Sequence, residues 1–182
     1  MLKKYFIVLL LILISACAGI KNEQDDLTLI DLASNKIIPS ANSNFSHYKS
    51  YKNWTLLYSK NACALISYPL SSYGSYVARN LHYIYINYNK AKGSNEIAII
   101  AGKTLKENEP VKVELNNYMF LFQPIKDVAW ANNETRIISE MLNLVALDFL
   151  VYVEFADASY TIDKYSIEGF KDAFSSLRKM CL

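Results

Sequence analysis

The sequence predicts a mainly β protein: an antiparallel β-sandwich with two short helices packed at its edges. Three observations predict it. About seven short segments rich in β-branched and aromatic residues lie between turn residues. Only two segments space their apolar residues as a helix does. The chain has no internal repeat, and short strands in sequence favour an antiparallel arrangement.

The chain begins with the pattern of a signal peptide. Two lysines precede an unbroken apolar run from Tyr5 to Ile14, which is shorter than the roughly 20 residues that cross a bilayer. The run ends in Ile14-Ser15-Ala16-Cys17, which resembles a lipobox, so we expect cleavage before Cys17 and lipidation of this cysteine. The alternative is cleavage after Ala18, because Ala16-Cys17-Ala18 also fits an ordinary signal peptidase.

The chain therefore divides into three parts. Residues 1–16 form the signal peptide, residues 17–52 a lipidated N-terminus and polar tether, and residues 53–182 the sandwich domain. The tether carries one segment, Leu27 to Leu32, that fits a short docked strand. Two or more acyl chains anchor a protein stably, and Ala18 resembles an outer-membrane signal. We expect an outer-membrane lipoprotein facing the periplasm or the cell surface; the alternative is a soluble periplasmic or secreted protein.

The charge of the mature chain is balanced. The whole sequence has 19 Lys+Arg and 17 Asp+Glu, and the two lysines of the signal peptide leave on cleavage. The remainder gives no overall positive field, so no nucleic-acid partner is expected. The expected partners are the membrane, through the lipid, and an envelope or host protein.

Two cysteines remain once Cys17 is set aside. Cys63 and Cys181 form an even pair in an oxidising compartment, which predicts a disulfide between the C-terminus and an early strand. The alternative is two separate thiols, one buried and one at a frayed end. No C-x-x-C spacing occurs, so neither a thiol-redox site nor a zinc site is predicted.

The first half of the domain reads as short strands. In the segment Trp54 to Tyr58, large side chains at every second position alternate with Thr55 and Leu57. A Ser-Lys-Asn turn and the segment Ala62 to Ser67 follow, so the two segments fit a hairpin. Leu81 to Tyr88 and Glu96 to Ala101 are rich in β-branched and aromatic residues. Both are predicted strands.

The clearest hairpin joins Val111–Leu115 to the strand that starts at Tyr118. Its turn is Asn116-Asn117, and asparagine tolerates the positive φ of a two-residue turn. Such a turn pairs Leu115 with Tyr118, Val113 with Phe120 and Val111 with Phe122, which places six large residues on one face.

The last third mixes helices and strands. Asn132-Asn133 is predicted to cap a short amphipathic helix through residues 137–142, and residues 147–155 alternate as a strand with one face in the core. A turn at residues 157–159 leads to a strand at 160–165. Ser166 is then predicted to cap a helix whose apolar stripe consists of Phe170, Ala173, Phe174 and Leu177.

Two stretches of the chain have a recognisable pattern. One is the opening Asn53-Trp54-Thr55-Leu56-Leu57 with Ala62-Cys63-Ala64-Leu65 soon after it. The other runs from Arg136 to Phe174 and includes Val153-Glu154-Phe155-Ala156-Asp157-Ala158-Ser159. Together they resemble the invasion-associated locus B family of small exported bacterial proteins. The resemblance implies an all-β exported protein linked to host-cell entry, without a defined chemistry.

The sequence departs from this family at its cysteines. Tyr58 stands where a cysteine usually follows the Trp, and a cysteine pair usual before the first helix is absent around Val128 to Asn132. The disulfide connectivity of the family therefore does not carry over to this chain.

Side chains with chemistry are few. The two histidines are His47, in the tether, and His82, in a predicted strand, and neither fits a metal spacing. No nucleophile elbow or phosphate loop occurs, so no catalytic residue, metal or cofactor is predicted. We expect the carboxylates of the C-terminal half to line a solvated sheet face; an acid/base pair is the alternative. These are Asp148, Glu154, Asp157 and Asp163.

The tyrosines suggest a contact surface. Aromatic side chains are enriched where proteins bind proteins or sugars, although strand packing also explains them. The candidates are Tyr83, Tyr85, Tyr118 and Tyr152, with Tyr88 beside them. We therefore expect a non-enzymatic envelope lipoprotein that acts by protein contacts in host-cell invasion or attachment. The alternatives are a periplasmic envelope-assembly or maintenance factor, and a small periplasmic sugar-binding protein or hydrolase, which would need a concave pocket with convergent polar groups.

Overall fold

The computed structural model describes residues 29–31, 36–38, 45, 47–60, 62–75 and 78–181. Two compact units cover the chain, Met1–Asn42 and Ser43–Leu182. In the first unit β1 (Leu29–Asp31) pairs in antiparallel fashion with β2 (Lys36–Ile38), where the sequence predicted a short strand. The predicted signal peptide and Cys17 lie outside the described residues, so both remain predictions.

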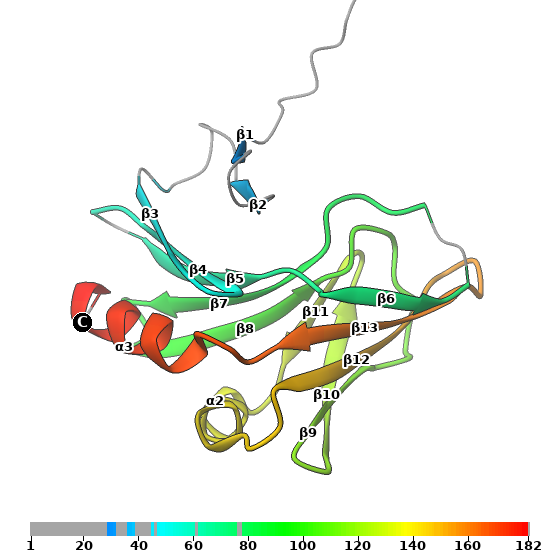
Figure 1. The fold of residues 1–182 in the computed structure, drawn as a ribbon. Coiled ribbons are helices and arrows are strands. Elements are labelled where there is room, and N and C mark those ends of the chain that lie inside the picture. The colour runs from blue at the N-terminus through cyan, green and yellow to red at the C-terminus, as the bar shows by residue number, and fades with distance from the viewer. Residues whose placement is uncertain are drawn as a thin grey trace, which may run out of the picture. The chain divides into compact units, whose positions relative to one another are not determined.

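A single open antiparallel sheet holds eleven of the described strands of the second unit (Figure 1). Its strands, in sheet order, are β3 (His47–Tyr51), β4 (Trp54–Tyr58), β5 (Cys63–Ser67), β7 (Tyr83–Asn89), β8 (Ser94–Ile100), β11 (Val128–Ala131), β10 (Tyr118–Ile125), β9 (Val111–Leu115), β12 (Asp148–Glu154), β13 (Tyr160–Ser166) and β6 (Ser71–Gly74). The prediction of a mainly antiparallel β domain with two helices is confirmed. A sandwich of two sheets is not what forms, because the pairing of β8 with β11 joins both halves into one ladder.

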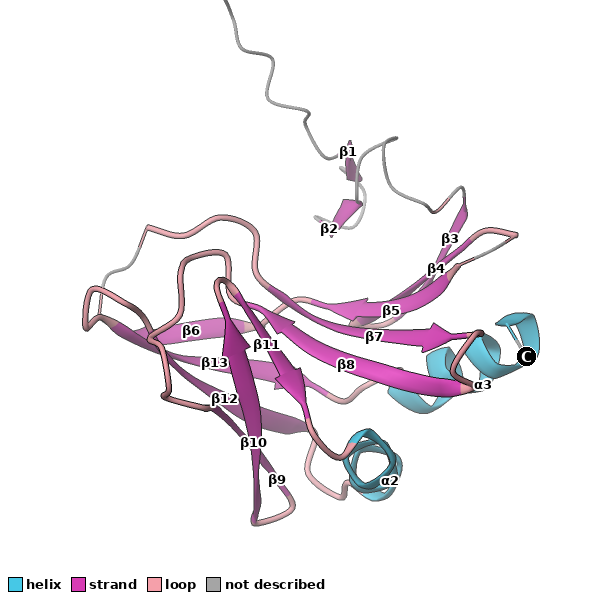
Figure 2. Cartoon of the chain, turned by 180° about the vertical axis from the view of Figure 1, so that it is seen from behind, coloured by secondary structure: helices cyan, strands magenta, loops and turns pink. Residues whose placement is uncertain are grey.

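The sheet curls on itself. β5 and β6 lie far apart in the strand order, yet only residues 68–70 separate them in the chain. The sheet must therefore bend until β6 returns toward β5. Figure 2 shows the bend from behind, with β9 and β10 running steeply across the direction of β7 and β8. A buried hydrogen bond crosses the curl: the Trp54 indole N–H in β4 donates to the Ser166 carbonyl of β13 at 3.0 Å.

The predicted hairpin forms with the predicted register. Leu115 pairs with Tyr118, Val113 with Phe120 and Val111 with Phe122. Asn116 and Asn117 have φ values of 49° and 66°, the left-handed conformation that this turn requires. The paired inward side chains of the hairpin are buried, except Tyr118 beside the turn.

Two helices pack against the inner face of the sheet. The helix α2 (Glu134–Asn143) lies beside β8, and α3 (Phe170–Cys181) packs on β4 and β5. The Asn133 side chain accepts a hydrogen bond from the Arg136 N–H at 3.2 Å, so the asparagine cap is confirmed. Neither of the described helices is long and apolar enough to cross a membrane.

The start of α3 differs from the prediction. Ser166 ends β13, and its hydroxyl accepts from the Glu168 N–H at 3.2 Å instead of capping the helix directly. Gly169 follows with φ +87°, and a Cβ at this position would collide with the Tyr51 carbonyl. The glycine thus lets the chain turn closely past β3 before α3 begins at Phe170.

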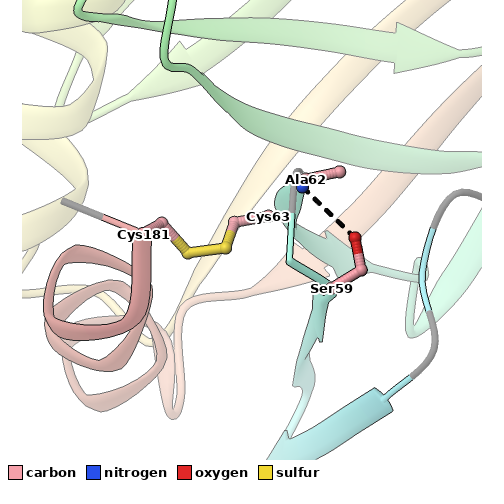
Figure 3. The surroundings of a disulfide bond; sticks show 4 residues. All are labelled: Ser59, Ala62, Cys63 and Cys181. Atoms are coloured by element: carbon pink, nitrogen blue, oxygen red, sulfur yellow. Dashed lines mark hydrogen bonds between the residues drawn. A yellow bond between two sulfur atoms is a disulfide. The ribbon is translucent and has the colours of Figure 1, made fainter.

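A disulfide joins Cys63 of β5 to Cys181 at the end of α3, as predicted (Figure 3). The two Cα atoms lie 6.1 Å apart, within the range that a disulfide spans. The turn that precedes Cys63 is held by the Ala62 N–H, which donates to the Ser59 hydroxyl at 3.2 Å. The bond therefore fastens the C-terminal helix to a central core strand.

Three strands of the eleven-stranded sheet were not predicted. β3 lies within the range assigned to the tether and pairs along its length with β4, so the sheet begins before residue 53. β11 continues the hairpin of β9 and β10, and β6 forms the edge beside β13. His47 is accordingly a strand residue, with its ring 5.3 Å from that of Tyr58.

Candidate functional site

A buried ion pair lies where β6, β13 and the segment before β7 meet. Arg79 donates to both carboxylate oxygens of Asp163, at 2.9 and 2.5 Å, and to the Ser72 hydroxyl at 3.0 Å. The Arg79 side chain is 4% exposed and the Asp163 side chain is 1% exposed. The prediction that Asp163 lies on a solvated face is wrong, because Arg79 supplies the partner that a buried carboxylate needs.

The inner face of β13 is polar along most of its length. Thr161, Asp163 and Tyr165 alternate inward and all three are buried. Burial raises the pKa of the Tyr165 hydroxyl well above its usual range, and the nearby Asp163 carboxylate acts in the same direction. Among the described residues, the Thr161 and Tyr165 hydroxyl oxygens have no hydrogen-bond partner. Such groups are rare in native interiors and usually mark bound water or a ligand.

A cavity of about 550 Å³ opens beside this polar row. Its lining includes Ser72, Tyr73 and Gly74 of β6, Ser75 directly after this strand, and Thr161 of β13. Arg79 and His82, from the segment that leads into β7, complete the lining. The sequence analysis did not find this site, because its residues come from an edge strand and a loop without a recognisable spacing.

His82 lines the cavity, and its surroundings favour the neutral imidazole. Burial lowers the pKa of the imidazole, and the Arg79 guanidinium lowers it further. The Nδ1 atom lies 3.2 Å from the Asn80 carbonyl, which only accepts, so Nδ1 carries the proton. The other ring nitrogen, Nε2, is then an acceptor.

A second feature lies on the outer face of the sheet. The strand registers align five outward side chains in a row across β10, β9, β12, β13 and β6. This outer row consists of Leu121, Lys112, Tyr152, Ile162 and Tyr73. Leu121 is 48% exposed and Tyr73 61% exposed. Four of its five members are large and apolar or aromatic.

A hollow of about 380 Å³ lies along the outer row, lined in part by Met119, Tyr160 and Ile162. Ion pairs flank it, including Lys106 with Glu154 at 2.8 Å and Lys164 with Asp148 at 2.6 Å. The charges around the row are thus paired with each other. An apolar strip with a polar rim is typical of a surface that contacts another protein, and here the charged groups of the rim are paired.

The structure does not gather the four predicted contact tyrosines into one patch. Tyr152 belongs to the outer row, and its hydroxyl donates to Glu114 at 2.7 Å. Tyr118 starts β10, and the Arg136 guanidinium carbon lies over the Tyr118 ring, 4.8 Å from the ring centre. Tyr83 and Tyr85 lie on β7, separated from β12 by β8, β11, β10 and β9. Burial raises the pKa of Tyr85 to about 12, so this side chain is partly packed.

The other predicted carboxylates are surface groups with cationic partners. Asp157 accepts from Lys103 at 2.6 Å, and this contact, with the Ser159 hydroxyl, lowers its pKa to about 2. Asp148 and Glu154 form the two ion pairs beside the outer row. Within the described part of the chain, no group of three or more His, Cys, Asp or Glu side chains is placed to hold a metal ion.

Comparisons with known proteins find similarity at the level of the fold. No family model matches this chain, and a search of curated proteins finds no match. Among solved structures, the fold is similar to the crystal structure of invasion-associated protein B from Bartonella henselae. The match covers 74% of this chain and 98% of that chain, with 11% sequence identity and a TM-score of 0.48.

Proposed function

We propose that this chain is a non-enzymatic, lipid-anchored envelope protein that binds another protein through the outer row. The observation that carries the proposal is the row itself, in which four of five adjacent strands place an aromatic or aliphatic side chain on the outer face. Tyrosine and large apolar side chains supply most of the binding energy at protein interfaces. A monomeric surface needs no such strip.

Export and anchoring are the second part of the proposal. They rest on the apolar N-terminal run, on the cysteine at position 17 and on the balanced charge of the remaining chain. The Cys63–Cys181 disulfide supports them, because such bonds persist in oxidising compartments and are rare in the cytosol. The link to host-cell attachment or entry comes from the sequence resemblance alone.

The test of anchoring compares the wild type with Cys17→Ser in the native host. We expect a lipid-modified N-terminal peptide that starts at Cys17, found in the membrane fraction, and release of the variant into the soluble fraction. An unmodified N-terminus beyond Ala18 would instead show a soluble periplasmic or secreted protein.

The test of the contact surface uses the double variant Tyr73→Ser/Ile162→Thr. Both changes remove apolar area from the outer row without entering the core, since Tyr73 is exposed and Ile162 is half-buried. Attachment to host cells should fall several-fold, while envelope integrity stays intact. Val145→Thr is the matched control, because Val145 is 92% exposed and is not a member of the row.

A periplasmic assembly or maintenance factor would use the same surface on the other side of the membrane. Added protease on intact cells distinguishes the two, because only a surface-exposed domain is cut. Protection of the domain, together with a leaky envelope on deletion, would favour the assembly role.

A further inference from the structure

We propose that the cavity beside β6 binds a neutral ligand rich in hydroxyl groups, of the size of a monosaccharide or disaccharide. Ser72, Arg79 and His82 line the site, and Tyr73 of the outer row contributes to its edge. The proposal goes beyond the protein contact proposed above, because it assigns a small-molecule ligand to a different cavity and does not require a protein partner.

The charge of the lining favours a neutral ligand. Arg79 is the one Lys or Arg among the described lining residues, and the lining includes no Asp or Glu. Its guanidinium is already paired in bidentate fashion with Asp163 behind it. With His82 neutral, the site therefore has no net charge to attract an anion or a cation.

The hydrogen-bonding groups of the lining are mixed. His82 Nε2 is an acceptor, because Nδ1 donates to the Asn80 carbonyl. The Ser72 hydroxyl oxygen accepts from Arg79 and the Ser75 hydroxyl oxygen accepts from the Tyr160 N–H at 3.4 Å, so each can direct its own proton to a ligand. A ligand hydroxyl both donates and accepts, which a carboxylate or an ammonium group does not.

An unpartnered group points to an occupant. Thr161 lines the cavity, is only 5% exposed, and its hydroxyl has no partner among the described residues. A buried hydroxyl without a partner costs stability unless water or a ligand meets it. The cavity, about 550 Å³, is within the size range of small-molecule sites and exceeds what single waters need.

The experiment is saturation-transfer NMR on the full chain, purified in a detergent without a sugar headgroup. The probes are glucose, N-acetylglucosamine and trehalose, with acetate and methyl phosphate as charged probes, because both anions carry methyl protons that report transfer. We expect transfer to at least one saccharide and none to either anion. Absence of transfer to all three saccharides at tens of millimolar, or transfer to the anions alone, overturns the proposal.

Matched histidine variants locate the site. His82→Phe keeps a ring but removes the acceptor, so affinity for the saccharide should fall about ten-fold, the usual scale for one lost hydrogen bond. His47→Phe, on β3, should leave the affinity unchanged. Ser75→Ala gives a second, smaller change that should also weaken binding, and thermal unfolding confirms that each variant folds. Equal affinity in all four proteins would mean that the saccharide binds elsewhere, and would contradict the proposal.

Discussion

The two ends of the curled sheet are stabilised in different ways. At the α3 end, where β4 and β5 pack on α3, the inward side chains are apolar and a disulfide adds a covalent link. At the β6 end, formed by β13, β6 and residues 78–82, the interior holds an ion pair, two unpartnered hydroxyls and a cavity. Trp54 of one end contacts Ser166 of the other.

The α3 end acts as the scaffold, and the β6 end holds the candidate ligand site. Apolar burial and a disulfide stabilise a fold without specifying a ligand, and both are concentrated where α3 covers the sheet. Buried polar groups cost free energy unless each is paired, so their presence at the β6 end needs a reason other than stability. Ligand binding in the cavity supplies that reason.

The largest expected loss of stability comes from a change at the α3 end. The disulfide closes a loop with a sequence separation of 118. Double substitution Cys63→Ser/Cys181→Ser should lower the free energy of unfolding by about 4 to 5 kcal/mol in the chain-entropy model. Urea denaturation with and without a reductant measures it. A loss below about 1 kcal/mol would show that α3 is held by packing alone.

The buried ion pair is the corresponding test at the β6 end. Arg79→Ala leaves Asp163 buried without its cation and should cost about 3 to 5 kcal/mol in urea denaturation. The double variant Arg79→Met/Asp163→Leu removes both charges and should recover most of that loss. If the single variant is as stable as the wild type, Asp163 is not buried as described.

The Trp54–Ser166 hydrogen bond between the two ends should contribute less to the free energy of unfolding. Trp54→Phe removes the indole N–H and leaves the Ser166 carbonyl without this donor, so we expect a loss of about 1 to 3 kcal/mol. Trp130→Phe, at a partly exposed position of β11, is the control and should change stability little. Equal losses in both variants would mean that ring packing, and not the hydrogen bond, decides the effect.

The smallest effect depends on pH. Because the pKa of His82 is lower in the folded state, the unfolded chain binds more protons near the ordinary histidine pKa, and stability rises with pH in that range. The wild type should therefore lose more stability between pH 7 and pH 5 than His82→Phe. An identical pH profile for the wild type and His82→Phe would contradict the lowered pKa of His82.

The sequence predicted the local features of both ends but not their association. The hairpin of β9 and β10 was predicted with its register, because turn residues and alternation agreed. The asparagine cap of α2 and the disulfide were also predicted, since each rests on a short pattern or a count. One curled sheet was missed because alternating strands look the same in a sheet and in a sandwich.

The polar interior could not be predicted for a physical reason. In the segment Tyr160 to Lys164, consecutive side chains point to opposite faces of the sheet. Ile162 is apolar and its neighbours Thr161 and Asp163 are polar, so hydrophobic patterning alone would place Ile162 inward. The structure turns Asp163 inward instead, because Arg79 reaches it from 84 positions away in the chain. β6 is short, and three of its four residues are Ser or Gly, so no strand signal marked the wall of the cavity.

Site-specific photo-crosslinking on intact host-associated cells tests the central claim, that the outer row is a protein contact surface. A photoreactive benzoyl-phenylalanine replaces Tyr73, Leu121 or, as the control, Val145; all three positions are exposed. The account predicts one discrete adduct of the same partner from positions 73 and 121 and none from position 145. Adducts that are absent from the row, or equally abundant at position 145, would contradict it.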